Sequence, residues 1–258
     1  MAENWLALMI GNSRLHWAWL TDETLQHTWN TPHLSVEKVR LLIESQFNFE
    51  KAEISRSTPT PFWETLPQLW IASVVPEQAH LWETYPHVRT IALDQIPLQN
   101  TYSTLGVDRA LAVWGAIETY GSPILVIDGG TALTFTGADQ QRFVGGAILP
   151  GLQLQFRMLG QATSALPVVE RMTLPDRWAM TTIEAIQSGI LHTVLSGVQN
   201  FIEDWQTRFP QSAIVFTGGD GHLLYRYIQP RSREFLSQII VDLDVWVWGL
   251  RSIKKRSV

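Results

Sequence analysis

The alternation of apolar and polar residues predicts two similar hairpins, one in each half of the chain. Apolar runs cover residues 6–8 and 124–127, and each run is followed by a glycine turn and then by alternating apolar and polar residues. This pattern is typical of a strand, a tight turn and a second strand. When residue 9 is aligned with residue 128, residues 9–17 match residues 128–136 as two copies of one turn.

The rest of the pattern predicts alternating strands and helices in both halves. In the first half we expect strands at residues 15–20, 24–29, 69–75 and 88–93, and helices at 36–46 (with Ser35 as N-cap), 77–85 and 108–120. In the second half we expect strands at residues 143–148, 213–217 and 239–246, and helices at 151–160, 182–205 and 223–228. The order predicts an α/β fold of two similar domains, 1–118 and 119–258, with mixed sheets and a cleft between them.

The two glycine turns are candidates for anion binding. Glycine beside small hydroxyl or amide residues lets backbone N–H groups approach a phosphate, because no Cβ blocks the way. One such turn alone is more often a plain structural hairpin. Two copies in a chain of 258 residues favour a duplicated fold that holds a nucleotide between its halves.

Composition narrows the class of protein. A hydrophobic fraction of 45% with 17% charged residues is ordinary for a globular protein, and a net charge of −5 argues against general nucleic-acid binding. The absence of cysteine excludes disulfides, thiolate metal sites and cysteine nucleophiles, and the seven histidines show no zinc-like spacing. No apolar run is long enough for a membrane helix and no basic leader is present, so we expect a cytoplasmic protein without membrane contact.

Three further features have mainly structural interpretations. The 12 tryptophans are scattered and predict core and interface packing. The basic cluster at residues 254–256 is expected to be a solvated tail. Asp242 and Asp244 have the spacing to share one face of a strand, which an edge or solvent-facing position explains.

Several motifs, in a fixed order along nearly the whole chain, resemble those of one enzyme family. The motifs are Ile10-Gly11-Asn12-Ser13, Ser73-Val74-Val75-Pro76, Leu105-Gly106-Val107-Asp108-Arg109, Asp128-Gly129-Gly130-Thr131-Ala132, residues 145–152, residues 182–189 and Thr217-Gly218-Gly219-Asp220. They resemble the superfamily of actin, sugar kinases and acetate kinase, and within it type III pantothenate kinase. The resemblance implies two duplicated actin-like (ribonuclease H-like) domains and ATP-dependent phosphorylation of pantothenate, the first step of coenzyme A synthesis.

The resemblance also implies a role for each motif. The ATP phosphates would be held by the first turn and by Thr131, with the first turn consisting of Met9, Ile10, Gly11, Asn12, Ser13, Arg14, Leu15 and His16. Pantothenate would be bound by Tyr102, Gly106, Val107, Asp108, Arg109 and Thr182, with Asp108 as the catalytic base. Thr217, Gly218 and Gly219 would shape the adenosine side of the pocket. Asp128 would bind a monovalent cation, K⁺ or NH₄⁺, beside ATP with Mg²⁺, and a homodimer with contacts from Trp114 and the helix that begins at Thr182 is expected.

The sequence departs from the family pattern at three places. Met9 occupies the position of the first-turn aspartate, and a thioether does not coordinate Mg²⁺. The family's substrate-contacting tyrosine is matched by Gln99, whereas Tyr102 lies closer to Gly106 and takes its place if the loop is shortened. Thr181 stands where an asparagine is usual.

The residue types suit phosphoryl transfer. That reaction needs an oriented hydroxyl, an in-line phosphate and charge neutralisation, and Asp108 could accept the hydroxyl proton. Arg109 could pair with a carboxylate or phosphate. Without the resemblance, this Asp-Arg pair would be interpreted as a helix N-terminus with a surface arginine. Two alternatives stay open: a nucleotide-binding regulator similar to the Bvg accessory factor, prompted by Met9, and a sugar or acetate kinase, which fits the motifs less well.

Overall fold

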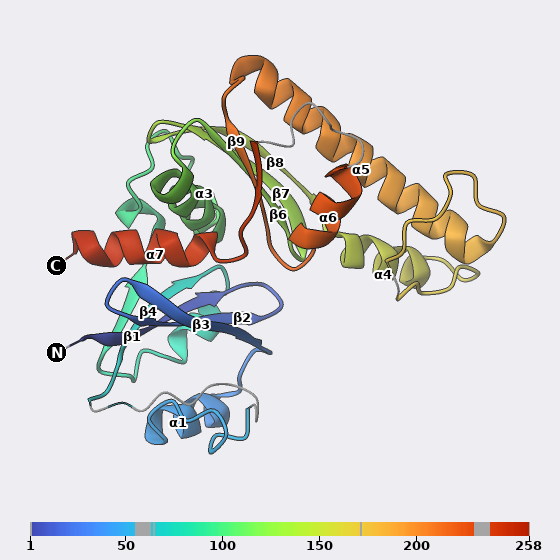
Figure 1. The fold of residues 1–258 in the computed structure, drawn as a ribbon. Coiled ribbons are helices and arrows are strands. Elements are labelled where there is room, and N and C mark those ends of the chain that lie inside the picture. The colour runs from blue at the N-terminus through green and yellow to red at the C-terminus, as the bar shows by residue number, and fades with distance from the viewer. Residues whose placement is uncertain (1, 55–62, 64, 171, 230–237, 258) are drawn as a thin grey trace. The chain divides into compact units, whose positions relative to one another are not determined.

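The computed structural model (Figure 1) describes residues 2–54, 63, 65–170, 172–229 and 238–257. The chain forms two compact units, which are described separately below. Unit 1 comprises Met1–Pro97, Tyr102–Gly115 and Trp246–Val258, and unit 2 comprises Leu98–Thr101 and Ala116–Val245. The division falls within helix α3 (Val107–Tyr120), which also contains the predicted boundary between residues 118 and 119.

The sheet of unit 1 has five strands in the order β3-β2-β1-β4-β5. Their bounds are β1 Asn4–Ile10, β2 Leu15–Thr21, β3 Thr24–Thr31, β4 Gln68–Ser73 and β5 Val88–Ile91. The first three strands form an antiparallel meander, whereas β1, β4 and β5 run parallel. All five strands lie where the hydrophobic pattern predicts them.

The sheet of unit 2 repeats this topology. Its order is β10-β9-β6-β7-β8, with β6 Ile124–Gly129, β7 Ala132–Asp139, β8 Arg142–Pro150, β9 Ala213–Thr217 and β10 Ile239–Val241. Strands β6, β7 and β8 form the antiparallel meander, and β6, β9 and β10 run parallel. The equivalent order and direction of all five strands confirm the predicted α/β fold with two repeated mixed-sheet halves.

The register of the hairpins corrects the position-by-position alignment of the two turns. In unit 1, Met9 lies opposite His16, and in unit 2, Asp128 lies opposite Thr134. The sequence alignment matched His16 with Phe135 instead. The second turn is therefore one residue shorter, so the alignment holds through the first strand and the glycines and then shifts by one residue.

Strand β1 separates two apolar layers of unit 1, because successive side chains point to opposite faces of a sheet. Leu6 and Leu8 pack in the core with Val39 and Leu42 of α1 (Val36–Glu44). Trp5 lies on the other face. There, the Nζ of Lys254 from α7 (Val245–Arg256) lies 5.4 Å from the centroid of the Trp5 ring. Figure 1 shows the sheet of unit 1 with α1 and α7 on opposite sides.

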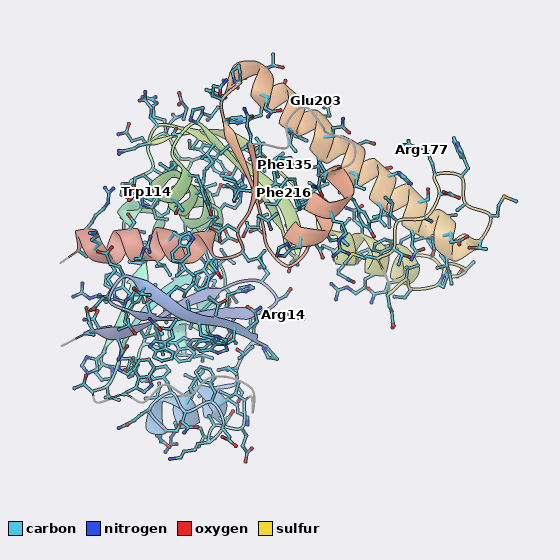
Figure 2. All side chains as sticks on the ribbon, viewed as in Figure 1. Arg14, Trp114, Phe135, Arg177, Glu203 and Phe216 are labelled. Atoms are coloured by element: carbon cyan, nitrogen blue, oxygen red, sulfur yellow. The ribbon has the colours of Figure 1, made fainter. Side chains whose placement is uncertain are left out.

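The helices α4 (Leu152–Ala162), α5 (Thr182–Arg208) and α6 (Gly221–Ile228) supply the apolar layer of unit 2. Leu125, Phe135 and Phe216 of the sheet share a core with side chains of these helices, and Figure 2 labels both phenylalanines at the sheet beside α5. Two short helices, α2 (Pro76–His80) and the 3-10 turn η1 (Leu93–Gln95), complete the described elements. Within the part of the chain that the structure describes, no helix is long and apolar enough to cross a membrane.

One helix and one strand end well before their predicted bounds. The helix expected at residues 77–85 ends at His80, and Pro76 is its first residue rather than the end of the preceding strand. The strand expected at residues 239–246 ends at Val241, and α7 follows. The prediction was wrong because the alternating residues 241–245 suggested that the strand continues, whereas residues from Val245 onward form a helix that buries Val247, Leu250 and Ile253.

Of the predicted solvated tail at residues 254–256, Lys255 and Arg256 are exposed as predicted, whereas Lys254 is packed. Lys254 is only 8% exposed and its Nζ pairs with Glu3 Oε2 at 2.7 Å. The pair Asp242 and Asp244 also differs from the prediction, because both follow β10 in a turn in which the Asp244 N–H donates to Asp242 Oδ1. Helix α7 therefore belongs to the structure of unit 1 and is not an appendage.

Candidate active site

The first glycine turn closes the hairpin between β1 and β2. The N–H of Gly11 donates to the carbonyl oxygen of Arg14 at 3.0 Å. Residues 12–14 are exposed, and Figure 2 shows Arg14 at the tip of the hairpin. Ile10 and Leu15, in contrast, are fully buried and anchor the turn in the core. Of the predicted ATP-binding residues 9–16, the exposed ones are therefore Asn12, Ser13 and Arg14.

Met9 does not present a ligand atom at this turn. Its side chain is 4% exposed and lies on the same face of β1 as Trp5. The family's aspartate at this position is thus replaced by a packed apolar group. Any metal binding in unit 1 has to come from other residues or from the nucleotide.

Two histidines flank the first turn. The Nε2 of His33 lies 2.8 Å from the Gly11 carbonyl oxygen, and the Nδ1 of His16 lies 2.7 Å from Asn30 Oδ1. Burial lowers the pKa of His16, an effect that the Asn30 hydrogen bond partly offsets. His16 is therefore a packed histidine whose hydrogen bond joins β2 to β3.

Within unit 1, the residue after β4, Val74, contacts both the end of β1 and the residue before α3. The N–H of Val74 donates to the Ile10 carbonyl oxygen at 3.0 Å, and the Val74 side chain also faces Gly106. A Cβ on Gly106 would collide with the carboxylate of Asp108. Within unit 1, the structure thus places Gly106 next to the segment that follows β4 and bonds to the end of β1, and a side chain at position 106 would displace the Asp108 carboxylate.

Asp108 lies in the first turn of α3 and is half-buried. Its Oδ1 accepts a hydrogen bond from the Arg109 N–H at 2.7 Å. Burial raises the pKa of the Asp108 carboxyl, and the hydrogen bond and positive charge of Arg109 oppose that rise. A carboxylate whose pKa is raised is a stronger base than an exposed aspartate, which suits proton abstraction.

Arg109 and Tyr102 form the polar wall beside Asp108. Arg109 is 6% exposed, and its Nη1 donates to the Tyr102 hydroxyl at 3.0 Å. The Leu105 N–H donates to the Tyr102 carbonyl oxygen at 3.0 Å, which closes the loop before α3. Gln99 belongs to unit 2, where its backbone exchanges hydrogen bonds with Gln141 and Phe143.

The second glycine turn lies at the carboxyl end of β6 in unit 2. The N–H of Gly130 donates to the Ala132 carbonyl oxygen at 3.0 Å, and the N–H of Gly151 donates to the Thr131 carbonyl oxygen at 2.9 Å. The Thr131 side chain is exposed. The turn is thus held by its backbone and leaves Thr131 accessible to a ligand.

A glycine-rich loop after β9 packs against Asp128. Gly218 has φ +78°, and a Cβ there would collide with the Asp128 carboxylate and lie 2.7 Å from the Gly129 carbonyl oxygen. The N–H of Asp220 donates to that same oxygen at 2.8 Å. Burial raises the pKa of Asp220. Asp220 was not among the predicted site residues, although it ends the quoted Thr217–Asp220 motif.

Thr182 is exposed at the first position of α5. The preceding Thr181 is the N-cap: its Oγ1 accepts from the Glu184 N–H at 3.3 Å and donates to Glu184 Oε2 at 2.9 Å. This side-chain cap explains why threonine is tolerated at position 181. Thr182 keeps its hydroxyl free of the capping bonds and accessible to solvent.

The arrangement of carboxylates among the described residues suits a magnesium ion that is bound mainly by the phosphates of a nucleotide. Among the described residues, no three His, Asp or Glu side chains gather into a metal site. Mg²⁺ usually keeps several waters and uses one or two carboxylates together with substrate phosphates. Asp128 at the second turn is a half-buried carboxylate.

Known proteins share both the sequence and the fold. The family model of type III pantothenate kinase matches residues 5–204. A type III pantothenate kinase from Nostoc sp. is 47% identical over 258 residues, which cover 96% of this chain and 94% of that protein. A second, from Synechocystis sp., is 45% identical over 232 residues and covers 88% of this chain and 82% of that protein.

Solved structures with lower identity share the architecture. A Campylobacter jejuni protein assigned to the Baf family of transcriptional activators has a TM-score of 0.64 at 18% identity, with 98% of both chains covered. Component A of the (R)-2-hydroxyglutaryl-CoA dehydratase of Acidaminococcus fermentans has a TM-score of 0.54 at 13% identity, with 99% of this chain and 100% of that chain covered. At these identities the likeness concerns the fold, whereas the family match and the two cyanobacterial relatives show that the chain belongs to the type III pantothenate kinase family.

Proposed function

We propose that this protein transfers the γ-phosphoryl group of ATP to the primary hydroxyl of pantothenate, the first step of coenzyme A synthesis. The observation that carries the proposal is the half-buried Asp108, placed by Gly106 and set beside the buried Arg109 and the Tyr102 hydroxyl. Family membership supplies the identity of the substrate. The reaction belongs to the cytoplasm, where ATP is available.

Asp108 acts as the general base in this proposal. As the hydroxyl oxygen of pantothenate bonds to the γ-phosphorus, the bond from that phosphorus to the bridging oxygen of ADP breaks. The hydroxyl proton passes to Asp108, and ADP leaves. Because burial raises the pKa of Asp108, the carboxylate is better matched to this proton transfer than an exposed aspartate.

Arg109 and Tyr102 orient pantothenate through its polar groups. The guanidinium of Arg109 is buried, and its fork of donors suits a carboxylate. Tyr102 is 44% exposed and its hydroxyl already accepts from Arg109, so a substrate can contact the exposed side of the ring. Thr182 adds a hydroxyl at the start of α5.

The two glycine turns bind the phosphates. A Cβ at Gly11 would lie 3.4 Å from the Arg14 carbonyl oxygen, and one at Gly130 would lie 3.6 Å from Asp128 Oδ1, so the protein itself has room for a methyl group at both positions. Neither glycine has a left-handed backbone. A bound phosphate is therefore the group that these two glycines would accommodate.

Asp128 is the proposed protein ligand for the magnesium and monovalent ions of the reaction. Magnesium, when bound, would neutralise charge on the phosphate oxygens, and Asp128 is the carboxylate that would contact it directly or through water. The same oxygen-donor chemistry suits a monovalent cation, K⁺ or NH₄⁺, at Asp128. Because Met9 brings no oxygen, we assign the metal to Asp128 and the phosphates alone.

A homodimer is the proposed assembly, with no nucleic acid or membrane partner. Trp178 is 88% exposed and Met180 is 94% exposed, immediately before α5, and Ile183 on α5 is 53% exposed. Such large apolar side chains, close together in sequence, are typical of a contact surface. Trp114, which the sequence suggested for the interface, is fully buried and donates to Ser252 Oγ at 3.2 Å.

The test is pantothenate-dependent release of ADP by the purified protein in the presence of ATP, Mg²⁺ and K⁺. We expect turnover that disappears in Asp108→Ala, while binding of ATP persists. A folded protein that binds ATP but releases no ADP would contradict the proposal. That result would favour the second candidate, a nucleotide-binding regulator in which the buried Met9 has removed catalysis.

In that case Met9→Asp is the follow-up variant. Restored turnover would show that the missing carboxylate had been limiting. Replacing K⁺ by Na⁺ tests the monovalent ion separately, because only a specific cation site distinguishes the two ions at equal ionic strength.

A further inference from the structure

His33 lies against the first turn from the segment between β3 and α1. Its Nε2 is 2.8 Å from the carbonyl oxygen of Gly11. Because a carbonyl oxygen only accepts hydrogen bonds, Nε2 carries the proton and is the donor. The next residue, Leu34, is buried in the core of unit 1, and Ser35 caps α1, so the backbone that carries the imidazole is fixed on both sides of this contact.

This hydrogen bond sets the direction of one peptide plane. The carbonyl of Gly11 and the N–H of Asn12 belong to the same peptide group, and in a trans peptide they point in opposite directions. When the Gly11 oxygen is held toward His33, the Asn12 N–H is turned away from His33. Within the described residues, the Asn12 N–H has no hydrogen-bond acceptor.

The same bond prepares the Asn12 N–H as a donor. A hydrogen bond to a peptide oxygen polarises the group and strengthens its N–H as a donor. Asn12 is exposed, and the Gly11 N–H is already used in the bond to the Arg14 oxygen. The turn therefore offers one oriented, polarised N–H at its exposed tip, and an anion is the ligand class that such a donor binds.

We infer that His33 is a positioning residue for nucleotide binding: through Gly11 it orients the Asn12 N–H toward a phosphate of ATP. The imidazole itself does not contact the phosphate. This inference rests on the proposed function, since it assigns a part of the machinery that holds the nucleotide. His33 lies outside residues 9–16, which the sequence motif marks for ATP.

The test compares binding of a non-hydrolysable ATP analogue with Mg²⁺, measured by titration calorimetry, across three variants. His33→Leu removes the donor and keeps a side chain of comparable bulk. His33→Gln keeps an amide N–H the same number of bonds from Cβ as Nε2. The control is His80→Leu, which alters an exposed histidine of unit 1 whose Nδ1 lies 2.6 Å from Glu83 Oε1.

We expect His33→Leu to weaken analogue binding about threefold to tenfold, the range that corresponds to one lost hydrogen bond. His33→Gln should stay within about twofold of the unaltered protein, as should the control. In turnover assays the KM for ATP should rise in His33→Leu, whereas the KM for pantothenate should not change. Thermal melting of each variant shows that the folded state is being compared.

The outcomes separate the inference from the proposed function. If the unaltered protein binds the analogue and His33→Leu binds it equally well, the inference is overturned while the kinase proposal stands. Equal losses in His33→Leu and His33→Gln, or equal changes in the KM values of both substrates, also overturn it. If the unaltered protein does not bind the analogue at all, the proposed function fails and the inference fails with it.

Discussion

Replacement of Gly130 by alanine separates the demands of the fold from the demands of the ligand. A methyl group at Gly130 would lie 3.6 Å from Asp128 Oδ1 and 3.7 Å from the Ala132 carbonyl oxygen, which are ordinary contacts. Gly→Ala at a compatible position stabilises a protein by about 0.4–1 kcal/mol, because the unfolded chain loses freedom. We therefore expect the melting midpoint of Gly130→Ala to stay level or to rise by about 1–4 °C.

Nucleotide binding should respond in the opposite direction. If a phosphate occupies the space beside Gly130, the methyl group displaces it from the backbone donors of the turn. Loss of one hydrogen bond to a charged group costs about 1.5–3 kcal/mol, which weakens binding of an ATP analogue by roughly 10- to 150-fold. Calorimetric titration with the analogue and Mg²⁺ measures this change directly.

Gly218→Ala is the matched control within the same unit. Gly218 has φ +78° and a Cβ there would collide with Asp128, so alanine is strained by about 1–2 kcal/mol even before neighbouring atoms shift. This variant should melt several degrees lower. If Gly130→Ala melts as low as Gly218→Ala, or binds the analogue like the unaltered protein, the assignment of Gly130 to the phosphate site is refuted.

Three further predictions concern the base, the C-terminal helix and the dimer. The kcat/KM for pantothenate should fall as pH drops through the raised pKa of Asp108, because the base must be ionised, and this acid limb should lie above the ordinary value of about 3.9. Since burial destabilises the ionised carboxylate in the folded state, Asp108→Asn should also melt higher at pH 7. Lys254→Met, which breaks the half-exposed pair with Glu3, should lower stability by about 1–2 kcal/mol in denaturant titrations. The double variant Trp178→Ser and Met180→Ser should shift the mass measured by sedimentation equilibrium from dimer to monomer.

Controls and contrary results for these predictions follow from the same structure. Lys255→Met removes an exposed pair with Glu23 and should leave stability close to that of the unaltered protein. Val36→Ser alters an apolar side chain that is 61% exposed on α1 and should leave the mass unchanged. The reasoning fails if the acid limb lies at the ordinary pKa, if both lysine variants behave alike, or if the double serine variant sediments as the unaltered protein does.

Local pattern was sufficient to predict most of the fold. Strands such as β1 and β6 are short apolar runs bounded by glycine turns, and Ser35 caps α1 as its residue type predicts, accepting from the Lys38 N–H at 3.3 Å. The repeat was recognisable because both copies keep the strand and the glycines. The one-residue shift after the turn was not recognisable from the sequence. Apolar and polar residues alternate on both sides of the turn, so the alignment of the two copies looks plausible with or without the shift.

The error at the C-terminus has a different cause. Residues 241–245 alternate like a strand, and the basic residues 254–256 suggest a solvated end. Helical burial and the ion pair of Lys254 with Glu3 depend on contacts with residues far away in the sequence. The pattern within a short stretch of sequence does not reveal such contacts. Long-range packing therefore decided both the secondary structure and the burial of this segment.

The candidate site was predictable only as far as motifs reach. Gly106, Asp108 and Arg109 belong to one short motif, and burial raises the pKa of Asp108. The hydrogen bond from Arg109 to Tyr102 supports the interpretation in which Tyr102 takes the place of the family's substrate-contacting tyrosine. His33, in contrast, carries no motif, because a histidine that bonds to a backbone oxygen is visible only once that oxygen has been placed.

The position of α7 has a consequence for the order in which the chain is completed during synthesis. The face of β1 that carries Trp5 receives Lys254 only after the ribosome has made the residues of unit 2. Unit 2 can therefore finish folding before unit 1, although unit 1 begins first. Until α7 emerges, the growing chain exposes an apolar sheet face, and this is the interval in which a nascent chain of this protein most needs protection from aggregation.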